Sequence, residues 1–184
     1  MTVAFDNTML SILLNPNGKI PDDPATGAPV VEARARAESV VQRIQKQRRK
    51  IILPAPAVSE LLTAIGPDAQ QYINVVSRSR VFAIGNFDAL GAAELALLNR
   101  DTFATHDAQQ KAEPYQKRKV DRQIIAICKV YGVSEIYTDD KGLANRARMC
   151  GITPISISGI SIPDSARQVE IVFEPHEPIP EIEE

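Results

Sequence analysis

The sequence predicts an α/β fold, a three-layer α/β/α sandwich around a central, mostly parallel sheet. Short apolar runs of strand length alternate along the chain with longer helical patterns. At 184 residues, the chain is long enough for one domain with a substantial core and short for two. Neither an internal repeat nor a dividing linker is evident. We therefore expect a single domain over residues 1–165 and an acidic tail over residues 166–184.

The expected elements follow from the local patterns in chain order. Strands are predicted at residues 3–5, 51–53, 81–84 and 135–138, with a last one within 152–162. Helices are predicted at residues 7–14, 31–50, 57–65, 68–79, 87–104, 121–131 and 141–149. Prolines and glycines indicate a surface loop before residue 31, so residues 16–50 form an inserted loop and helix. A polar loop is expected over residues 105–119.

Composition excludes several classes of protein. Apolar residues make up 44% and charged residues 24%, the usual balance for a soluble globular protein. Tryptophan is absent and aromatic residues are only 5%, which argues against a base-stacking platform for single strands. No apolar stretch is long enough for a membrane span, and no secretory signal is evident, so we expect a cytoplasmic protein. Cys128 and Cys150 are expected to be reduced core residues.

The net charge of −2 hides an asymmetry along the chain. Residues 168–184 carry glutamates but no Lys or Arg, so the body that precedes them is mildly basic. The basic excess is too small to argue for a nucleic-acid partner by itself.

Four short acidic segments are the most informative feature of the chain. They contain Asp6, Glu60, Asp121 and the pair Asp139 and Asp140. Each carboxylate lies at the end of an apolar run or the start of a helical one, and these places meet at one cleft in α/β folds. Asp6, Asp121 and Asp140 could each be a simple helix N-cap, whereas Glu60 has apolar neighbours that predict a largely buried helix face. Because clustered carboxylates are costly without cations, we favour one shared site.

The same segments resemble the motifs of the PIN-domain nucleases. Residues 6–10 read Asp-Asn-Thr-Met-Leu, and residues 59–62 read Ser-Glu-Leu-Leu. Residues 121–126 read Asp-Arg-Gln-Ile-Ile-Ala, and residues 138–140 read Thr-Asp-Asp. Order, spacing and context agree over about residues 2–155. The order Asn7-Thr8 reverses the commoner one, and the insertion and the tail exceed the compact bacterial members.

The resemblance implies an endoribonuclease that depends on a divalent metal ion. The implied site consists of the catalytic and metal-binding residues Asp6, Glu60, Asp121 and Asp140, a secondary ligand Asp139, and the supporting residues Asn7, Thr8 and Thr138. An oxygen-only ligand set without Cys or His selects hard cations, so Mg²⁺ or Mn²⁺ is the expected cofactor. Two such ions can activate water and stabilise the leaving oxygen of a phosphodiester, with Glu60 binding the second ion or orienting the water.

The resemblance also implies partners. RNA is the expected substrate, and family members commonly form homodimers. If the chain is a toxin of a toxin–antitoxin pair, an antitoxin protein would block the site. A role in host RNA processing or defence is equally compatible with the sequence.

Two other functions fit parts of the sequence. Residues 5–10 superficially match the nucleophile loop of haloacid-dehalogenase-like phosphatases. However, the second Asp and the Gly of that loop are missing, and Glu60 and Asp121 would have no role. A non-catalytic PIN-like binding scaffold is the other alternative, although such scaffolds usually lose acidic positions that are all filled here.

Two basic segments are candidate contacts to RNA. The first is the predicted helix end at residues 43–50, which is equally typical of a solvated helix face. The second consists of Lys117, Arg118, Lys119 and Arg122, which adjoin Asp121 and could hold phosphates.

Neutralising Lys117, Arg118 and Lys119 together should weaken RNA binding and flatten its dependence on salt concentration, because fewer counter-ions are released when phosphate contacts are lost. Fluorescence anisotropy titrations of a labelled RNA at several salt concentrations measure both quantities. An unchanged salt slope would contradict a phosphate-binding role for this segment.

Overall fold

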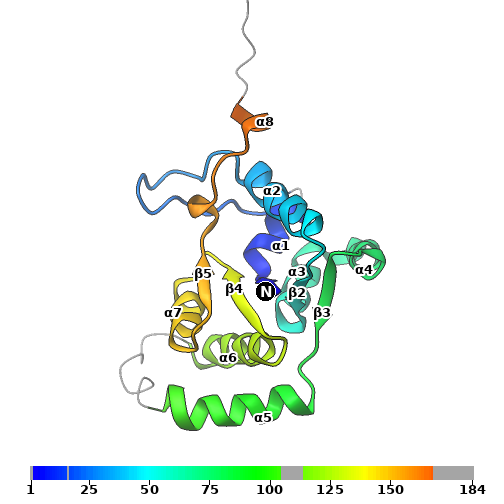
Figure 1. Ribbon diagram of the computed structural model, residues 1–184. Helices are drawn as coiled ribbons and strands as arrows, with labels where there is room; N and C mark the ends of the chain where they lie inside the picture. The colour runs from blue at the N-terminus through cyan, green and yellow to red at the C-terminus, as the bar shows by residue number, and fades with distance from the viewer. Residues whose placement is uncertain (1, 16, 105–113, 168–184) are drawn as a thin grey trace, which may run out of the picture.

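A computed structural model describes residues 2–15, 17–104 and 114–167. Within them, five parallel strands form one sheet in the order β3-β2-β1-β4-β5 (Figure 1). The strands are β1 (Thr2–Phe5), β2 (Ile51–Pro54), β3 (Phe82–Gly85), β4 (Val133–Tyr137) and β5 (Thr153–Ile155). The predicted parallel α/β sheet is confirmed, although β5 occupies only a short part of the range expected for it.

Helices cover both faces of the sheet. They are α1 (Asn7–Leu14), α2 (Ala33–Lys46), α3 (Ala55–Ile65), α4 (Ala69–Arg78), α5 (Ala89–Leu98), α6 (Tyr115–Val130), α7 (Lys141–Met149) and α8 (Asp164–Arg167). A π-helical turn, Asn99–Phe103, extends α5. Short 3₁₀ turns follow α3 (Gly66–Asp68) and β5 (Ile157–Gly159). Helices α1 and α2 lie on one side of the sheet, and α5, α6 and α7 lie on the other (Figure 1). This is the arrangement that right-handed crossovers produce.

Strands β1 and β4 are adjacent and end at the same edge of the sheet. Their register pairs Phe5 with Tyr137, and the two rings pack edge-to-face at 5.3 Å. Strands β2 and β3 lie on one side of β1, and β4 and β5 lie on the other. The strand order therefore reverses between β1 and β4, and a crevice forms at the carboxyl ends of these two strands. The residues that follow these strands, Asp6 and Thr138, therefore leave the sheet side by side. The Asp6 N–H still donates to the Tyr137 carbonyl at 3.2 Å.

The start of α6 is the largest departure from the predicted elements. The sequence pattern places Asp121 at a helix N-terminus, but α6 begins at Tyr115, and Asp121 lies in its second turn. The interpretation of Asp121 as an N-cap is therefore wrong. The first turns of α6 are exposed and charged, so they show no apolar periodicity, while Pro114 precedes the helix in an extended conformation. The rest of the expected loop, residues 105–113, lies outside the described residues.

The inserted segment is part of the main core. Helix α2 is shorter than predicted and ends at Lys46, and its buried face, Ala37, Val40 and Ile44, packs beside α1. The loop before α2 contains an isolated bridge between Asp22 and Pro29. The acidic tail from residue 168 onwards lies outside the described residues, so the predicted domain boundary stays a prediction.

Other expectations concern the surface and the thiols. On α5, Leu98 is buried, whereas Leu90 and Leu97 are exposed, and the predicted homodimer stays a prediction. Cys128 is buried and Cys150 is half-buried, and both are free thiols. Of the helices described here, none combines the length and apolar character needed to cross a membrane.

Replacing Gly85 with Ala should destabilise the fold by about 1–3 kcal/mol, because a Cβ there would lie 2.7 Å from the Ile127 Cγ2 and 2.8 Å from the Ile52 Cγ2. Urea unfolding followed by circular dichroism measures the change. Gly159→Ala is the matched control, since its Cβ would lie 3.4 Å from the Ser156 Oγ, in ordinary contact. Equal stabilities of the two variants would contradict tight packing at the end of β3.

Candidate functional site

Asp6 is the most buried acidic residue at the crevice. It is the N-cap of α1, and its Oδ1 accepts the Met9 N–H at 3.1 Å. Only 3% of the residue is exposed. The Thr138 side chain and the Thr8 backbone N–H are also close enough to favour the ionised carboxylate and so to lower its pKa. The local chain thus fixes this carboxylate at the end of β1, in the crevice between β1 and β4.

Thr138 links the two strand ends. Its side chain is buried, and its hydroxyl oxygen accepts the Asp140 N–H at 3.1 Å in addition to contacting Asp6. Its own backbone N–H donates to the Ile155 carbonyl of β5 at 2.9 Å. One short polar side chain therefore orients both Asp6 and the turn that carries Asp139 and Asp140.

Asp139 and Asp140 point to different partners. The two oxygens of Asp139 accept the Ile157 N–H at 3.2 and 3.3 Å. Asp140 is the N-cap of α7, with its Oδ1 accepting the Leu143 N–H at 3.0 Å. The Asp140 Oδ2 lies 2.6 Å from the Lys117 Nζ. Both carboxylates are thus held by protein donors, and of the two only Asp140 has a cationic partner among the described residues.

Glu60 lies on an exposed part of α3, so the expectation of a largely buried helix face is wrong for this residue. Val58 and Leu61 face the core, and Glu60 lies on the opposite side of the helix. Its carboxyl group is nevertheless close enough to Asp140 and Lys117 for both charges to shift its pKa. Glu60 therefore borders the carboxylates from the solvent side.

Asp121 forms a buried ion pair that the sequence did not indicate. Its Oδ2 accepts a hydrogen bond from the Arg146 Nη1 at 2.9 Å, and the two side chains are only 8% and 3% exposed. Arg146 lies on α7, so the pair joins α6 to α7. In the sequence, Arg146 looks like one more cation of an amphipathic helix.

Lys117, like Arg146, has a contact to a carboxylate that the sequence did not predict. It lies one helical turn before Asp121, and residues four apart share a helix face. The correct start of α6 would have indicated this proximity. Arg118 instead lies over the Tyr115 ring at 5.9 Å, and Arg122 lies over the Phe103 ring at 5.0 Å. The predicted basic cluster is thus divided between two faces of α6.

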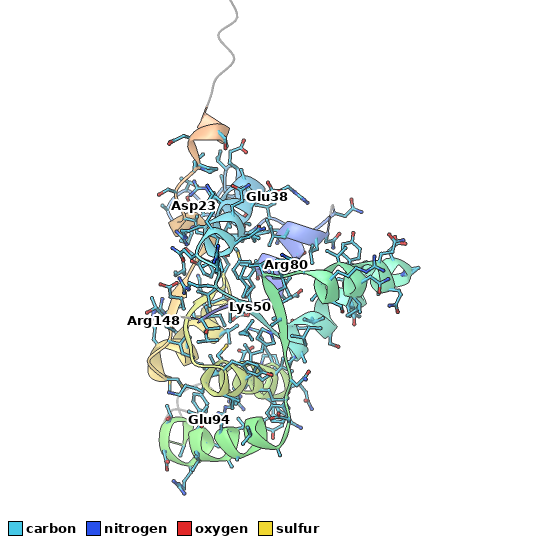
Figure 2. The ribbon with its side chains drawn as sticks, turned by 45° about the vertical axis from the view of Figure 1, so that its right-hand side comes forward. Asp23, Glu38, Lys50, Arg80, Glu94 and Arg148 are labelled. Carbon is cyan, nitrogen blue, oxygen red and sulfur yellow. The ribbon has the colours of Figure 1, made fainter. Side chains whose placement is uncertain are left out.

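A small pocket lies between α6 and the end of α5. Its volume is about 140 Å³, and it is lined by Leu95, Asn99, Tyr115, Arg118, Lys119 and Arg122. Lys50, the last residue of the other basic segment, lies where β2 and β3 begin: its Nζ donates to the Arg80 carbonyl at 2.6 Å, and both residues are labelled in Figure 2. Lys50 therefore lies at the edge of the sheet opposite to the carboxylates.

Burial and neighbouring charges shift the pKa values of the acidic groups. Desolvation raises the pKa of Asp6 to about 7, with a contribution from the Asp139 carboxylate, against its hydrogen bonds to Thr138 and to backbone N–H groups. Desolvation also raises the pKa of Asp139. For Glu60, desolvation and the Asp140 charge raise the pKa, and Lys117 opposes them. Desolvation acts to raise the pKa of Asp140 as well, but the Lys117 hydrogen bond and the α7 amides outweigh it and lower that pKa.

An open hollow of about 410 Å³ lies beside the carboxylates. Its walls are Asn7, Thr8, Ser11, Lys19, Pro21, Asp22, Asp139 and Asp140. The loop that precedes α2 thus forms one side of the hollow, and the first turn of α1 forms another. An adjoining hollow of about 640 Å³ runs along α7 past Lys141 and Arg148.

The carboxylates fit a divalent cation in donor chemistry. Within the described ranges, no three Asp, Glu, His or Cys side chains are grouped closely enough to hold an ion as they stand. Asp6 and Asp139, however, form no ion pair with any described residue, and burial makes their charges costly. The buried Oδ1 of Asn7 also has no hydrogen-bond partner among the described residues. These oxygens suit a hard cation or its bound water.

Replacing Arg146 with Met should destabilise the protein by about 3–5 kcal/mol, because Asp121 would lose its buried counter-charge. Thermal and urea unfolding measure the loss. Arg148→Met, on the exposed side of the same helix, is the control and should change stability far less. If both variants are equally stable, the ion pair does not hold α6 and α7 together.

Comparisons with known proteins give a likeness in structure but none in sequence. No protein-family model matches the chain, and no curated protein matches its sequence. The fold is similar to that of VapC20 from Mycobacterium tuberculosis, a toxin that cleaves the sarcin–ricin loop. The TM-score is 0.48 and the identity 15%, over 78% of this chain and 93% of that one. At this distance, a proposal on function has to rest on the geometry of the site itself.

Proposed function

We propose that the chain is an endoribonuclease that hydrolyses RNA phosphodiester bonds with the help of Mg²⁺ or Mn²⁺. The observation that carries the proposal is that Asp6 and the Asp139–Asp140 turn leave the sheet side by side where β1 and β4 end, with Glu60 near Asp140. Asp6 is close enough to Asp139, and Glu60 to Asp140, for each pair to interact electrostatically. Carboxylates held close together lower the stability of the fold, and binding of a cation would offset that loss.

Each acidic residue has a distinct place in this proposal. Asp6 and Asp139 would hold the cation, with Asp140 and Asp121 as the further carboxylates implied by the PIN-domain motifs. Thr138 keeps Asp6 and the Asp139–Asp140 turn in a fixed relation. When bound, the cation supplies an activated water and neutralises charge on the phosphate. Glu60, on the solvent side, is suited to orient a water or accept its proton, and partial desolvation favours that role by raising its pKa.

The open shape of the site suits a polymer. The hollow beside Asp139 and Asp140 is continuous with the surface and has polar walls, including Lys19. Lys119 and Arg118 line the small pocket between α6 and α5 and would hold phosphates further along the strand. RNA as the substrate, a homodimer and an antitoxin partner follow from the PIN-domain resemblance and stay predictions.

The phosphatase alternative makes poorer use of the observed site. It needs Asp6 as a nucleophile, with a second acid two residues later, where this chain has Thr8. It also gives no role to Glu60, which lies beside Asp140 and Lys117. The scaffold alternative leaves the costly burial of Asp6 unexplained.

Labelled single-stranded RNA should be cut internally with Mn²⁺ or Mg²⁺ and left intact with EDTA. Glu60→Gln and Asp6→Asn should each lower the cleavage rate by about 100-fold or more, as is usual when one charge-stabilising or proton-transferring group is removed. Glu60→Gln is the sharper variant, because Glu60 is exposed and its loss leaves the core intact. Denaturing gels of time courses measure the rates.

Glu38→Gln is the matched control, since Glu38 is an exposed glutamate of α2 and lies outside the hollow (Figure 2). It should cut RNA as the wild type does. Cleavage that persists in EDTA, or in both Glu60→Gln and Asp6→Asn, would contradict the proposal. Hydrolysis of p-nitrophenyl phosphate that requires Asp6, without RNA cleavage, would favour the phosphatase. Neither reaction would favour the scaffold.

A further inference from the structure

We propose that Lys117 is a built-in cation of the carboxylate site: its ammonium group takes the place at Asp140 and Glu60 that a second divalent ion would occupy, so the protein binds one divalent ion. The inference rests on the proposed function and deepens it. It assigns to Lys117 a role inside the site, in place of the phosphate contact that the sequence suggests.

The first step is the contact geometry. The Lys117 Nζ lies 2.6 Å from the Asp140 Oδ2, and the side chains are 44% and 29% exposed. Lys117 also acts on Glu60, whose pKa it lowers against the opposing effect of Asp140. A lysine ammonium has three donors, so it can serve two carboxylates at once. Its charge is therefore located between α3, α6 and the start of α7.

The second step is the direction in which Lys117 points. It lies in the first turn of α6, one turn before Asp121, so both residues face α7. Lys119, two residues further along, is exposed and instead lines the pocket between α6 and α5. The helix thus separates one lysine, which belongs to the acidic cluster, from a neighbour on the surface.

The third step is the distribution of charge. Asp121 has Arg146 as its partner, and Asp140 has Lys117. Asp6 and Asp139 form no ion pair with a described residue, and the buried Asn7 Oδ1 beside them lacks a hydrogen-bond donor in the same part of the chain. One half of the site is therefore neutralised by the chain itself, and the other half is left for a single cation from solution.

The consequence is chemical as well as electrostatic. An ammonium group stabilises negative charge and donates hydrogen bonds, but it carries no bound water that could become a nucleophile. Lys117 would therefore stabilise the negative charge of Asp140 and Glu60. Activation of the water would stay with Asp6, Asp139 and their cation, assisted by Glu60.

The test is the stoichiometry of Mn²⁺ binding to the full chain without RNA, measured by electron paramagnetic resonance of the free ion and by calorimetry. The wild type should bind one Mn²⁺ per chain, and Lys117→Met should bind two, because Asp140 and Glu60 lose their cation. Lys117→Arg, which keeps the charge, should bind one. Lys119→Met removes the same charge from the side of α6 that faces α5 and should also bind one.

Thermal melts establish that each variant is folded, and Lys117→Gln is a second neutral variant with the same expected stoichiometry of two. Equal stoichiometry in wild type and both neutral variants overturns the inference. If that common number is one or two and RNA is still cut, the proposed function stands without the inference. If no protein binds Mn²⁺ at all, the metal-dependent function fails with it. A second ion in Lys119→Met as well would point to a general charge effect and also overturn the role of Lys117.

Discussion

The repulsion between carboxylates at the ends of β1 and β4 is the constraint on which the rest of the site depends. The pairing of Phe5 with Tyr137 forces Asp6 to lie beside the Thr138–Asp140 turn. At the low effective dielectric of a buried crevice, such charges destabilise the fold unless each has a partner. Backbone N–H groups at the starts of α1 and α7 stabilise the carboxylates of Asp6 and Asp140. Cationic side chains from α6 and α7 stabilise those of Asp140 and Asp121. The packing of these helices is thus tied to the charge of the site.

Helix capping and a functional site are often treated as rival explanations for an acidic residue, but here they coincide. Asp6 caps α1 and Asp140 caps α7, so the simple structural interpretation is correct for both. Capping uses Oδ1 in each case, and in Asp140 the other oxygen contacts Lys117. The cap fixes the orientation of the carboxylate, which is what a binding site requires.

Most of the fold and part of the site could be predicted from the sequence. The α/β class, the parallel sheet and the bounds of α1 and α7 followed from apolar periodicity and from turn residues, because those signals are local. The first turns of α6 gave no such signal, since their charged side chains face solvent. The Asp121–Arg146 pair joins two helices, and nothing local distinguishes Arg146 from a surface arginine. The expected burial of Glu60 was wrong, because its apolar neighbours face the other way, and its place in the site stays a prediction.

Asp121 lies in the interior, so it contributes to the packing of α6 and α7 as well as to the charge of the candidate site. In the motif, it is one more metal ligand, but in the structure it is bound to Arg146 in a nearly inaccessible pair between α6 and α7. That pair also sets the orientation of α6, and α6 carries Lys117 towards Asp140. A change at Asp121 would therefore alter the stability of the helix pair, the position of Lys117 and the charge of the site together. Loss of activity in an Asp121 variant would therefore not show whether the residue takes part in the reaction or only stabilises the fold. Glu60 and Lys117 are at least partly exposed and touch the same charges, so they are the residues at which chemistry can be isolated.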